Sequence, residues 1–242
     1  MKKFLMMLML LMPVVASAEE EGLKLDKAPV NVQDYASIQR GAKLFTNYCL
    51  TCHSANYMRY NRMHDIGLTD DEIKNNLMFA AEKVGETMHV SMRPEEAAKW
   101  FGAAPPDLSV ISRARGADWL YTYLRSFYLD PSRPTGWNNT VFKNVGMPFV
   151  LYGLQGEQEL QVEKKMENGK EVEEDKLVLA KPGTMTEPEY DRAVADLVNY
   201  LVWMGEPSQS ERKHLGVYVM AFLAFFFVVA YFLKKEYWKD IH

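Results

Sequence analysis

Two uninterrupted apolar runs stand out from a chain in which apolar and polar residues are otherwise mixed. The first covers residues 4–15, directly after Lys2 and Lys3, and it is followed by Ala16-Ser17-Ala18. A basic start, a short apolar stretch and small residues at its end are typical of a cleaved export signal. We therefore expect residues 1–18 to be a signal peptide.

The second apolar run covers residues 215–233 and contains no charged residue. At about 1.5 Å per residue it reaches roughly 28 Å, the thickness of the hydrocarbon core of a bilayer. Lysines at 234, 235 and 239 follow it. The pattern predicts a single transmembrane anchor, a periplasmic domain over residues 19–207 and a cytoplasmic tail over residues 234–242 of an inner membrane protein.

Helical periodicity begins early in the domain. Between Asp34 and Leu50, apolar side chains recur every three or four residues, which predicts a helix with one apolar face. That face carries Ile38, Ala42, Phe45 and Cys49.

Two further helices are predicted from capping boxes, in which Thr is followed three residues later by Glu. One box is Thr69-Asp70-Asp71-Glu72, and the other is Thr186-Glu187-Pro188-Glu189. Apolar residues follow at helical spacing: Ile73, Leu77 and Ala80 after the first box, and Tyr190, Val194, Leu197, Val198, Leu201 and Val202 after the second.

Two more segments have recognisable patterns. Residues Ala117–Leu129 are expected to form a helix that ends before Asp130-Pro131. Residues Leu160–Leu179 are highly charged around Asn168-Gly169, a dipeptide favoured in two-residue turns, and predict a solvent-facing β-hairpin. The expected fold class is thus mainly α, with a small charged hairpin and one C-terminal transmembrane helix.

Charge narrows the choice of partners. The formal net charge is −4, and it becomes −6 without the signal peptide because two lysines are removed. Phosphate contacts need clustered Lys and Arg, so we do not expect this chain to bind nucleic acid. A basic protein is the more natural partner.

The strongest chemical motif is Cys49-Leu50-Thr51-Cys52-His53. Two cysteines three positions apart, followed at once by histidine, form the attachment pattern of a c-type haem. The two thiols bond the porphyrin, and the adjacent imidazole becomes the proximal iron ligand. The sequence therefore predicts one covalently bound haem c.

Two other readings of the motif are less well supported. A structural zinc site requires four ligands, but the chain has no cysteine besides Cys49 and Cys52. A thioredoxin-like dithiol would follow a strand, but the residues before Cys49 have a helical pattern.

A methionine in a loop is the expected sixth ligand. Met147 lies between Gly146 and Pro148, so it is not in a helix and can cross a haem face. A thioether raises the potential of a haem iron, as suits a late electron carrier. Met185 remains the alternative, and Met204 falls in the last helical stretch of the domain. Bis-histidine ligation would use His64 or His89, which are better explained as surface histidines.

Several motifs in a fixed order give a family resemblance. They are Cys49–His53, Ala104-Pro-Pro-Asp-Leu-Ser109, Arg113-Ala-Arg115, Thr135-Gly-Trp-Asn-Asn139, Gly146-Met-Pro148 and the C-terminal anchor. Together they resemble cytochrome c1, the haem subunit of the cytochrome bc1 complex. The resemblance implies a class I c-type cytochrome domain, in which an early and a late helix cross.

The resemblance also assigns site residues. It implies haem attachment at Cys49 and Cys52, iron ligation by His53 and Met147, a haem wall at Pro106 and a propionate partner at Arg115. Arg113 is an alternative for the propionate. Trp119 stands near the position of a family aromatic residue, with a difference of one residue in length.

The function implied is single-electron transfer from a Rieske iron–sulfur protein to a soluble cytochrome c, beside cytochrome b, in a respiratory quinol:cytochrome c reductase. The chain is then no enzyme by itself, because a haem with six ligands has no place for a substrate. Two alternatives remain: a free-standing anchored cytochrome that donates to an oxidase, and a peroxidase-like haem enzyme.

Overall fold

The computed structural model describes residues 24–90, 92–167 and 170–240, with the backbone alone described over residues 164–167 and 170–174. The expected signal peptide and the turn residues Asn168 and Gly169 lie outside the described residues. About half of the described residues are helical. The elements in chain order are α2 (Tyr35–Leu44), η1 (Phe45–Cys49), β1 (Ala55–Arg59), η2 (Tyr60–Ile66), α3 (Asp70–Asn76), β2 (Thr87–Met88), α4 (Pro94–Phe101), α5 (Ile111–Arg115), α6 (Ala117–Arg125), β3 (Phe127–Leu129), β4 (Trp137–Asn139), α7 (Tyr152–Gln155), β5 (Gly156–Glu167), β6 (Lys170–Pro182), α8 (Glu187–Gly205) and α9 (Gln209–Tyr237).

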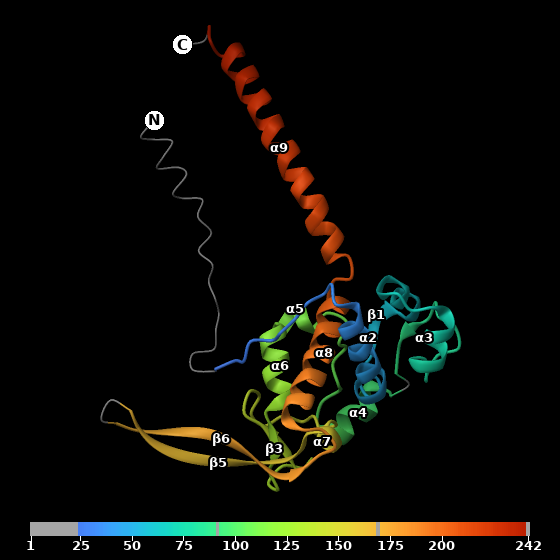
Figure 1. The fold of residues 1–242 in the computed structure, drawn as a ribbon, viewed down its shortest axis with the longest axis vertical. Coiled ribbons are helices and arrows are strands. Elements are labelled where there is room, and N and C mark those ends of the chain that lie inside the picture. The colour runs from blue at the N-terminus through green and yellow to red at the C-terminus, as the bar shows by residue number, and fades with distance from the viewer. Residues whose placement is uncertain (1–23, 91, 168–169, 241–242) are drawn as a thin grey trace.

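Helices α2 and α8 pack against each other at the centre of the globular part (Figure 1). Gly41 lies at the contact, where a Cβ atom would stand 2.0 Å from the carbonyl oxygen of Asp196. Only glycine allows the two helices to approach this closely. The rings of Phe45 and Tyr200 lie 5.3 Å apart, and Arg40 pairs with Asp196 at 2.6 Å. The early and the late helix of the domain therefore do meet, as expected.

The predicted helix over residues 34–50 is confirmed, but its last turn is wider than an α-helical turn. The Asp34 carboxylate begins the helix by accepting a hydrogen bond from the Ser37 N–H at 3.0 Å. At the other end, the Leu50 N–H donates to the Phe45 carbonyl at 2.9 Å, which makes a π-helical turn, η1. Such turns are frequent at functional sites. This one ends at Cys49.

Both predicted capping boxes begin helices. In α3, the Glu72 N–H donates to Thr69 Oγ1, and the Thr69 N–H donates to the Glu72 carboxylate. In α8, the N–H and hydroxyl of Thr186 both donate to the Glu189 carboxylate. Helix α3 ends at Asn76, so Ala80, which the periodicity had placed on it, lies beyond its end.

The predicted helix over residues 117–129 is wrong in its last part. Helix α6 ends at Arg125, and Phe127–Leu129 form strand β3, which pairs antiparallel with β4. Phe127 and Tyr128 have aromatic side chains that favour strands, and pairing with Trp137–Asn139 supplies backbone partners that local periodicity cannot reveal.

The charged β-hairpin is confirmed and is longer than predicted. Strands β5 and β6 pair from Gly156 opposite Pro182 to Glu167 opposite Lys170. The ribbon extends away from the helical body (Figure 1). At its base, the Gln158 side-chain amide donates to the Phe127 carbonyl at 2.9 Å, which joins the hairpin to β3.

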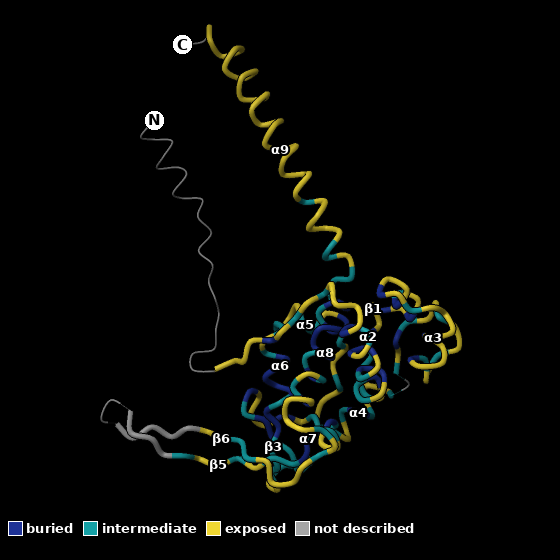
Figure 2. Tube along the Cα trace, viewed as in Figure 1, coloured by how far each residue is buried: buried dark blue, intermediate teal, exposed yellow. Residues whose placement is uncertain are grey.

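Helix α9 stands apart from the domain. It contains the predicted apolar run, has 29 residues and reaches a mean hydropathy of 2.4. The helix is exposed over almost its whole length, whereas the buried residues lie in the globular domain, on α2, α6 and α8 and on the segments packed around them (Figure 2). Among the described residues it is the one helix long and apolar enough to span a membrane.

Candidate functional site

The Cys49–His53 motif folds into one compact turn. The N–H groups of Cys52 and His53 both donate to the Cys49 carbonyl, at 3.1 and 2.9 Å. This arrangement places two thiols and an imidazole in the same turn. Covalent attachment and iron ligation can therefore be provided by adjacent residues.

Both thiols are shielded from ionisation. Burial raises the pKa of Cys49 to about 12, with a further contribution from Cys52, and burial also raises the pKa of Cys52. Redox-active cysteines instead have a lowered pKa, because the thiolate is the reactive form. The pair thus does not have the electrostatics of a catalytic dithiol.

The orientation of His53 is fixed by one hydrogen bond. Its Nδ1 lies 2.7 Å from the Pro106 carbonyl oxygen. A carbonyl can only accept, so Nδ1 carries the proton and Nε2 keeps its lone pair free for a metal. Burial lowers the pKa of His53 despite this hydrogen bond, which favours the neutral ring that ligation needs.

Asp107 fastens the segment that contains Pro106. Its two carboxylate oxygens accept from the N–H groups of Asn56 and Ser109, both at 2.8 Å. The Leu108 N–H donates to the Ser54 carbonyl at 2.9 Å. Burial works against ionisation of Asp107, but the hydrogen bonds from Ser109 and Asn56 outweigh it and lower the pKa. The carbonyl that orients His53 is therefore held at a defined distance.

Met147 is held by the hydroxyl of a buried tyrosine. Tyr123 donates to Met147 Sδ at 3.4 Å. Its ring stacks on Trp119, with centroids 4.7 Å apart and planes 12° apart. The Arg115 guanidinium lies over the other ring of this stack, 5.1 Å from the Trp119 centroid. We call Arg115, Trp119, Tyr123 and Met147 the aromatic column.

The loop before Met147 is fixed by two asparagines. Asn139 is fully buried; its Oδ1 accepts from the N–H groups of Val141 and Phe142 at 2.9 and 3.0 Å, and its Nδ2 donates to the Tyr123 carbonyl at 2.8 Å. Asn138 Oδ1 accepts from the Asn144 N–H at 2.8 Å. These bonds tie the Met147 loop to α6, the helix that carries Tyr123.

The structure separates the two candidate arginines. Arg115 belongs to the aromatic column, whereas the Arg113 side chain approaches Gly205 at the end of α8. Of the two, Arg115 is connected to the Met147 loop. Its predicted contact with a haem propionate stays a prediction.

The other ligand candidates have different surroundings. His64 Nε2 lies 2.8 Å from Asp70 and His89 Nδ1 lies 3.1 Å from Asn56, both on the surface. Met204 is buried in α8. Met185 is half-buried, and its N–H donates to the Leu154 carbonyl at the base of the hairpin. Met185 remains the alternative to Met147.

The residues present fit a c-type haem. The chain supplies two thiols, an imidazole with a free Nε2 and a thioether. Leu108, Trp119 and Met147 pack on the core but stay half-buried, so they leave an apolar surface that a porphyrin would cover. Within the described part of the chain, no group of three or more His, Cys, Asp or Glu side chains is placed to hold a metal ion.

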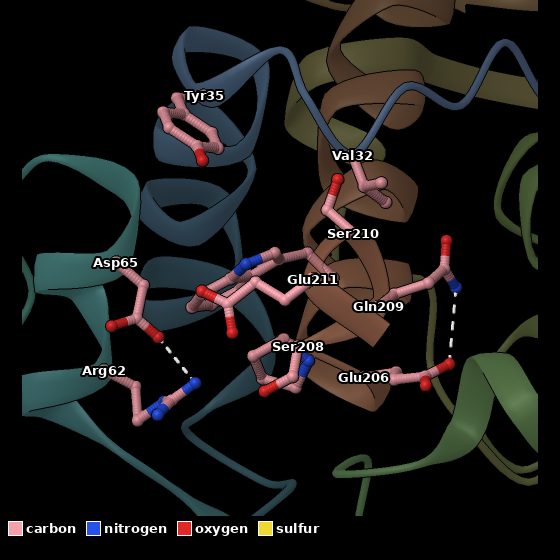
Figure 3. A pocket seen from close by; sticks show the side chains of 11 residues that line it. Val32, Tyr35, Arg62, Asp65, Glu206, Ser208, Gln209, Ser210 and Glu211 are labelled. Carbon is pink, nitrogen blue, oxygen red and sulfur yellow. Dashed lines mark hydrogen bonds and ion pairs between the residues drawn. The ribbon is translucent and has the colours of Figure 1, made fainter. Parts of the chain in front are cut away.

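A polar cavity of about 240 Å³ lies elsewhere, where the domain joins α9 (Figure 3). Its walls include Tyr35, Arg62, Asp65, Trp203 and Glu211. Arg62 and Asp65 pair with each other across 2.6 Å. None of the haem-motif residues lines this cavity, so it is not the cofactor site.

Sequence reasoning missed Tyr123, Asn139 and Asp107 as parts of the site. Asp107 and Asn139 do fall in the Pro-Pro-Asp-Leu-Ser and Thr-Gly-Trp-Asn-Asn motifs, which was the available signal. Tyr123 lies in none of these motifs, and its partner Met147 lies in a separate loop, so no local signal marked it.

Known proteins resemble this chain over almost its whole length. The sequence model of the Cytochrome C1 family matches residues 26–241. Cytochrome c1 of Allochromatium vinosum is 47% identical over 242 residues, covering 100% of this chain and 99% of that protein. A Nitrosomonas europaea protein named ammonia monooxygenase gamma subunit is 54% identical over 242 residues, covering 100% of this chain and 99% of that protein. Cytochrome c1 of Rhodospirillum rubrum is 27% identical over 255 residues, covering 93% of this chain and 92% of that protein.

Cytochromes c1 carry one covalently bound haem c and are membrane-anchored electron-transfer subunits of bc1-type complexes. The haem-motif turn and the apolar helix α9 match that description, and the family match extends over nearly all of the described residues. This chain therefore belongs to the cytochrome c1 family.

Proposed function

We propose that this chain accepts single electrons from a Rieske iron–sulfur protein and passes them to a soluble cytochrome c, as the anchored haem subunit of a quinol:cytochrome c reductase beside cytochrome b. The observation that carries the proposal is the 2.7 Å contact between His53 Nδ1 and the Pro106 carbonyl within the Cys49–His53 turn. It presents Nε2 as a ligand beside two attachment thiols.

Each site residue then has one role. Cys49 and Cys52 attach the haem, and His53 and Met147 ligate its iron. Pro106 forms part of the wall and orients His53 through its carbonyl. Arg115 offsets the charge of a propionate. The haem, when bound, supplies reversible one-electron chemistry.

The fold supports a class I cytochrome domain. In this proposal the α2–α8 crossing at Gly41 fixes the end of α2, and η1 then presents Cys49. Residues 19–207 form the haem domain, on the periplasmic side of the inner membrane. Residues 215–233 form the anchor and residues 234–242 the cytoplasmic tail, after removal of residues 1–18.

The acidic charge of the chain supports a basic acceptor. Complementary charges steer two proteins together, and salt screens exposed charges beyond about 8 Å at physiological ionic strength. Electron transfer to a basic soluble cytochrome c should therefore slow as salt increases. Glutamates of the hairpin are candidate sources of the negative charge that attracts the acceptor: Glu171, Glu173 and Glu174. Their side chains lie outside the described residues.

Co-purification tests the proposed complex. The tagged full chain, solubilised from its membrane in mild detergent, should bring down a b-type cytochrome and a Rieske protein. A version stopped after Gly205 serves as the matched control, because it keeps the haem domain without the anchor, and it should retain less of both partners. Recovery of an oxidase alone would favour the free-standing cytochrome, and recovery of ammonia monooxygenase subunits would favour the role named for the Nitrosomonas relative.

A further inference from the structure

Tyr123 is held in place from several directions, and its hydroxyl meets one acceptor. Its ring stacks on Trp119 and meets Phe127 edge-on, with centroids 5.0 Å apart at 68°. Its carbonyl accepts from Asn139 Nδ2 at 2.8 Å. Among the described residues, the acceptor found for its hydroxyl is Met147 Sδ, at 3.4 Å.

A thioether sulfur can take part in this bond and in iron ligation together. It has two lone pairs, so one can accept the hydroxyl proton while the other is directed at a metal. Neutral methionine sulfur is a weak acceptor, and a phenylalanine at position 123 would fill the same space in the core. The aligned hydroxyl is therefore not needed for packing.

We propose that Tyr123 is a positioning residue that orients Met147 by an O–H···S hydrogen bond and raises the potential of the iron that Met147 ligates. This inference rests on the proposed function, because it takes Met147 as the sixth ligand. Partners of metal ligands commonly tune the metal in this way.

The direction of the effect follows from the sulfur's electrons. A hydrogen bond to the sulfur withdraws electron density and weakens its donation to iron. Ferric iron, being poorer in electrons, depends on this sigma-donation more than ferrous iron does, whereas a thioether favours ferrous iron by accepting electron density from it, which the hydrogen bond does not weaken. The hydrogen bond therefore destabilises the oxidised state. Removing the hydroxyl should therefore lower the potential.

The test compares wild-type chain with Tyr123→Phe, both full-length, haem-loaded and in detergent. Phenylalanine keeps the ring stack on Trp119 and deletes the hydroxyl alone. The equilibrium with a fixed redox mediator should move toward the ferric form by about threefold to tenfold, where tenfold is 59 mV for one electron. The iron–sulfur charge-transfer band should shift in wavelength while remaining present.

Tyr200→Phe is the matched control. Tyr200 is a buried tyrosine whose hydroxyl donates to a different methionine sulfur, Met88 Sδ, at 3.3 Å. Loss of the Tyr200 hydroxyl should leave the wavelength of the charge-transfer band unchanged. A band shift of equal size in both variants would overturn the proposal, because it would show a general effect of deleting a buried hydroxyl.

A second variant makes the test independent of stability. With 3-fluorotyrosine at position 123, the phenol is more acidic and donates more strongly, so the potential should rise above the wild-type value. An unchanged or raised potential in Tyr123→Phe would overturn the inference. If the wild-type chain itself lacks the charge-transfer band, it is instead the assignment of Met147 as ligand that fails.

Discussion

The Pro106 carbonyl oxygen and His53 Nδ1 lie 2.7 Å apart, although 53 residues separate them in the sequence. The contact joins the haem motif to the Pro-Pro-Asp-Leu-Ser segment. It fixes both the tautomer and the direction of the imidazole, because the carbonyl accepts the Nδ1 proton. Two of the motifs behind the family resemblance thus form one structural unit.

Asp107 holds these two motifs together through its hydrogen bonds. We therefore expect its carboxylate to make the stability of the folded chain depend on pH. The pKa of Asp107 is lowered in the folded chain, so its stabilising effect is present above the ordinary carboxyl pKa and is lost as the pH falls through the folded value. Asp107→Asn should cost about 1 kcal/mol at pH 7, since the carboxylate is partly exposed. Thermal unfolding in detergent at pH 7 and below about pH 4 measures this. An equal difference between variant and wild type at both pH values would contradict the role of the charged form.

Gly41→Ala should disrupt the α2–α8 crossing. The new methyl group would stand 2.0 Å from the Asp196 carbonyl oxygen, so the helices must separate. Overpacking of this kind costs about 1–3 kcal/mol or more, and thermal unfolding should show it. Gly153→Ala is the control, because a Cβ there meets no atom within 4 Å. Equal loss of stability in both variants would mean that close approach is not the reason for Gly41.

Replacing both haem-motif cysteines should remove the haem. In the Cys49→Ala, Cys52→Ala double variant, no thiol remains to bond the porphyrin. Haem-dependent peroxidase staining should stay with the wild-type polypeptide in a denaturing gel and should be lost from the variant. Staining that persists in the variant would contradict covalent attachment at these residues.

A chain that ends after Gly205 should be released from the membrane. It retains the whole buried core, including α2 and α8, and lacks α9, the candidate span. We expect a haem-loaded domain in the soluble fraction of the periplasm, whereas the full chain stays with the membrane after a salt wash. If the shortened chain also resists the wash, another part of the molecule must hold it there.

The sequence predicted best those features that depend on neighbouring residues. The capping boxes at Thr69 and Thr186 and the charged hairpin of β5 and β6 lie in short stretches with their own physical signals. The end of α6 was predicted wrongly because β3 depends on pairing with Trp137–Asn139, a contact between separate segments.

The site shows the same division. Cys49, Cys52 and His53 lie within five residues, so the motif alone predicts their role. The hydrogen bond from Tyr123 to Met147 spans 24 residues and requires Asn139 to join the loop to α6. The spacing of residues along the chain does not predict such contacts, because they form only when distant segments pack together in the folded core.

The most direct test of the account is the midpoint potential of Met147→Leu, measured beside Met185→Leu as its matched control. Leucine keeps a similar volume and removes the thioether, so the haem should stay covalently attached, lose the iron–sulfur charge-transfer band and bind carbon monoxide. Its potential should fall by more than about 100 mV, since about 30 mV corresponds to roughly 0.7 kcal/mol for one electron and a lost ligand bond is worth a few kcal/mol. Met185→Leu should leave the band and the potential unchanged. The opposite outcome, with Met185→Leu losing the band and Met147→Leu keeping it, would contradict the assignment of Met147 as the sixth ligand.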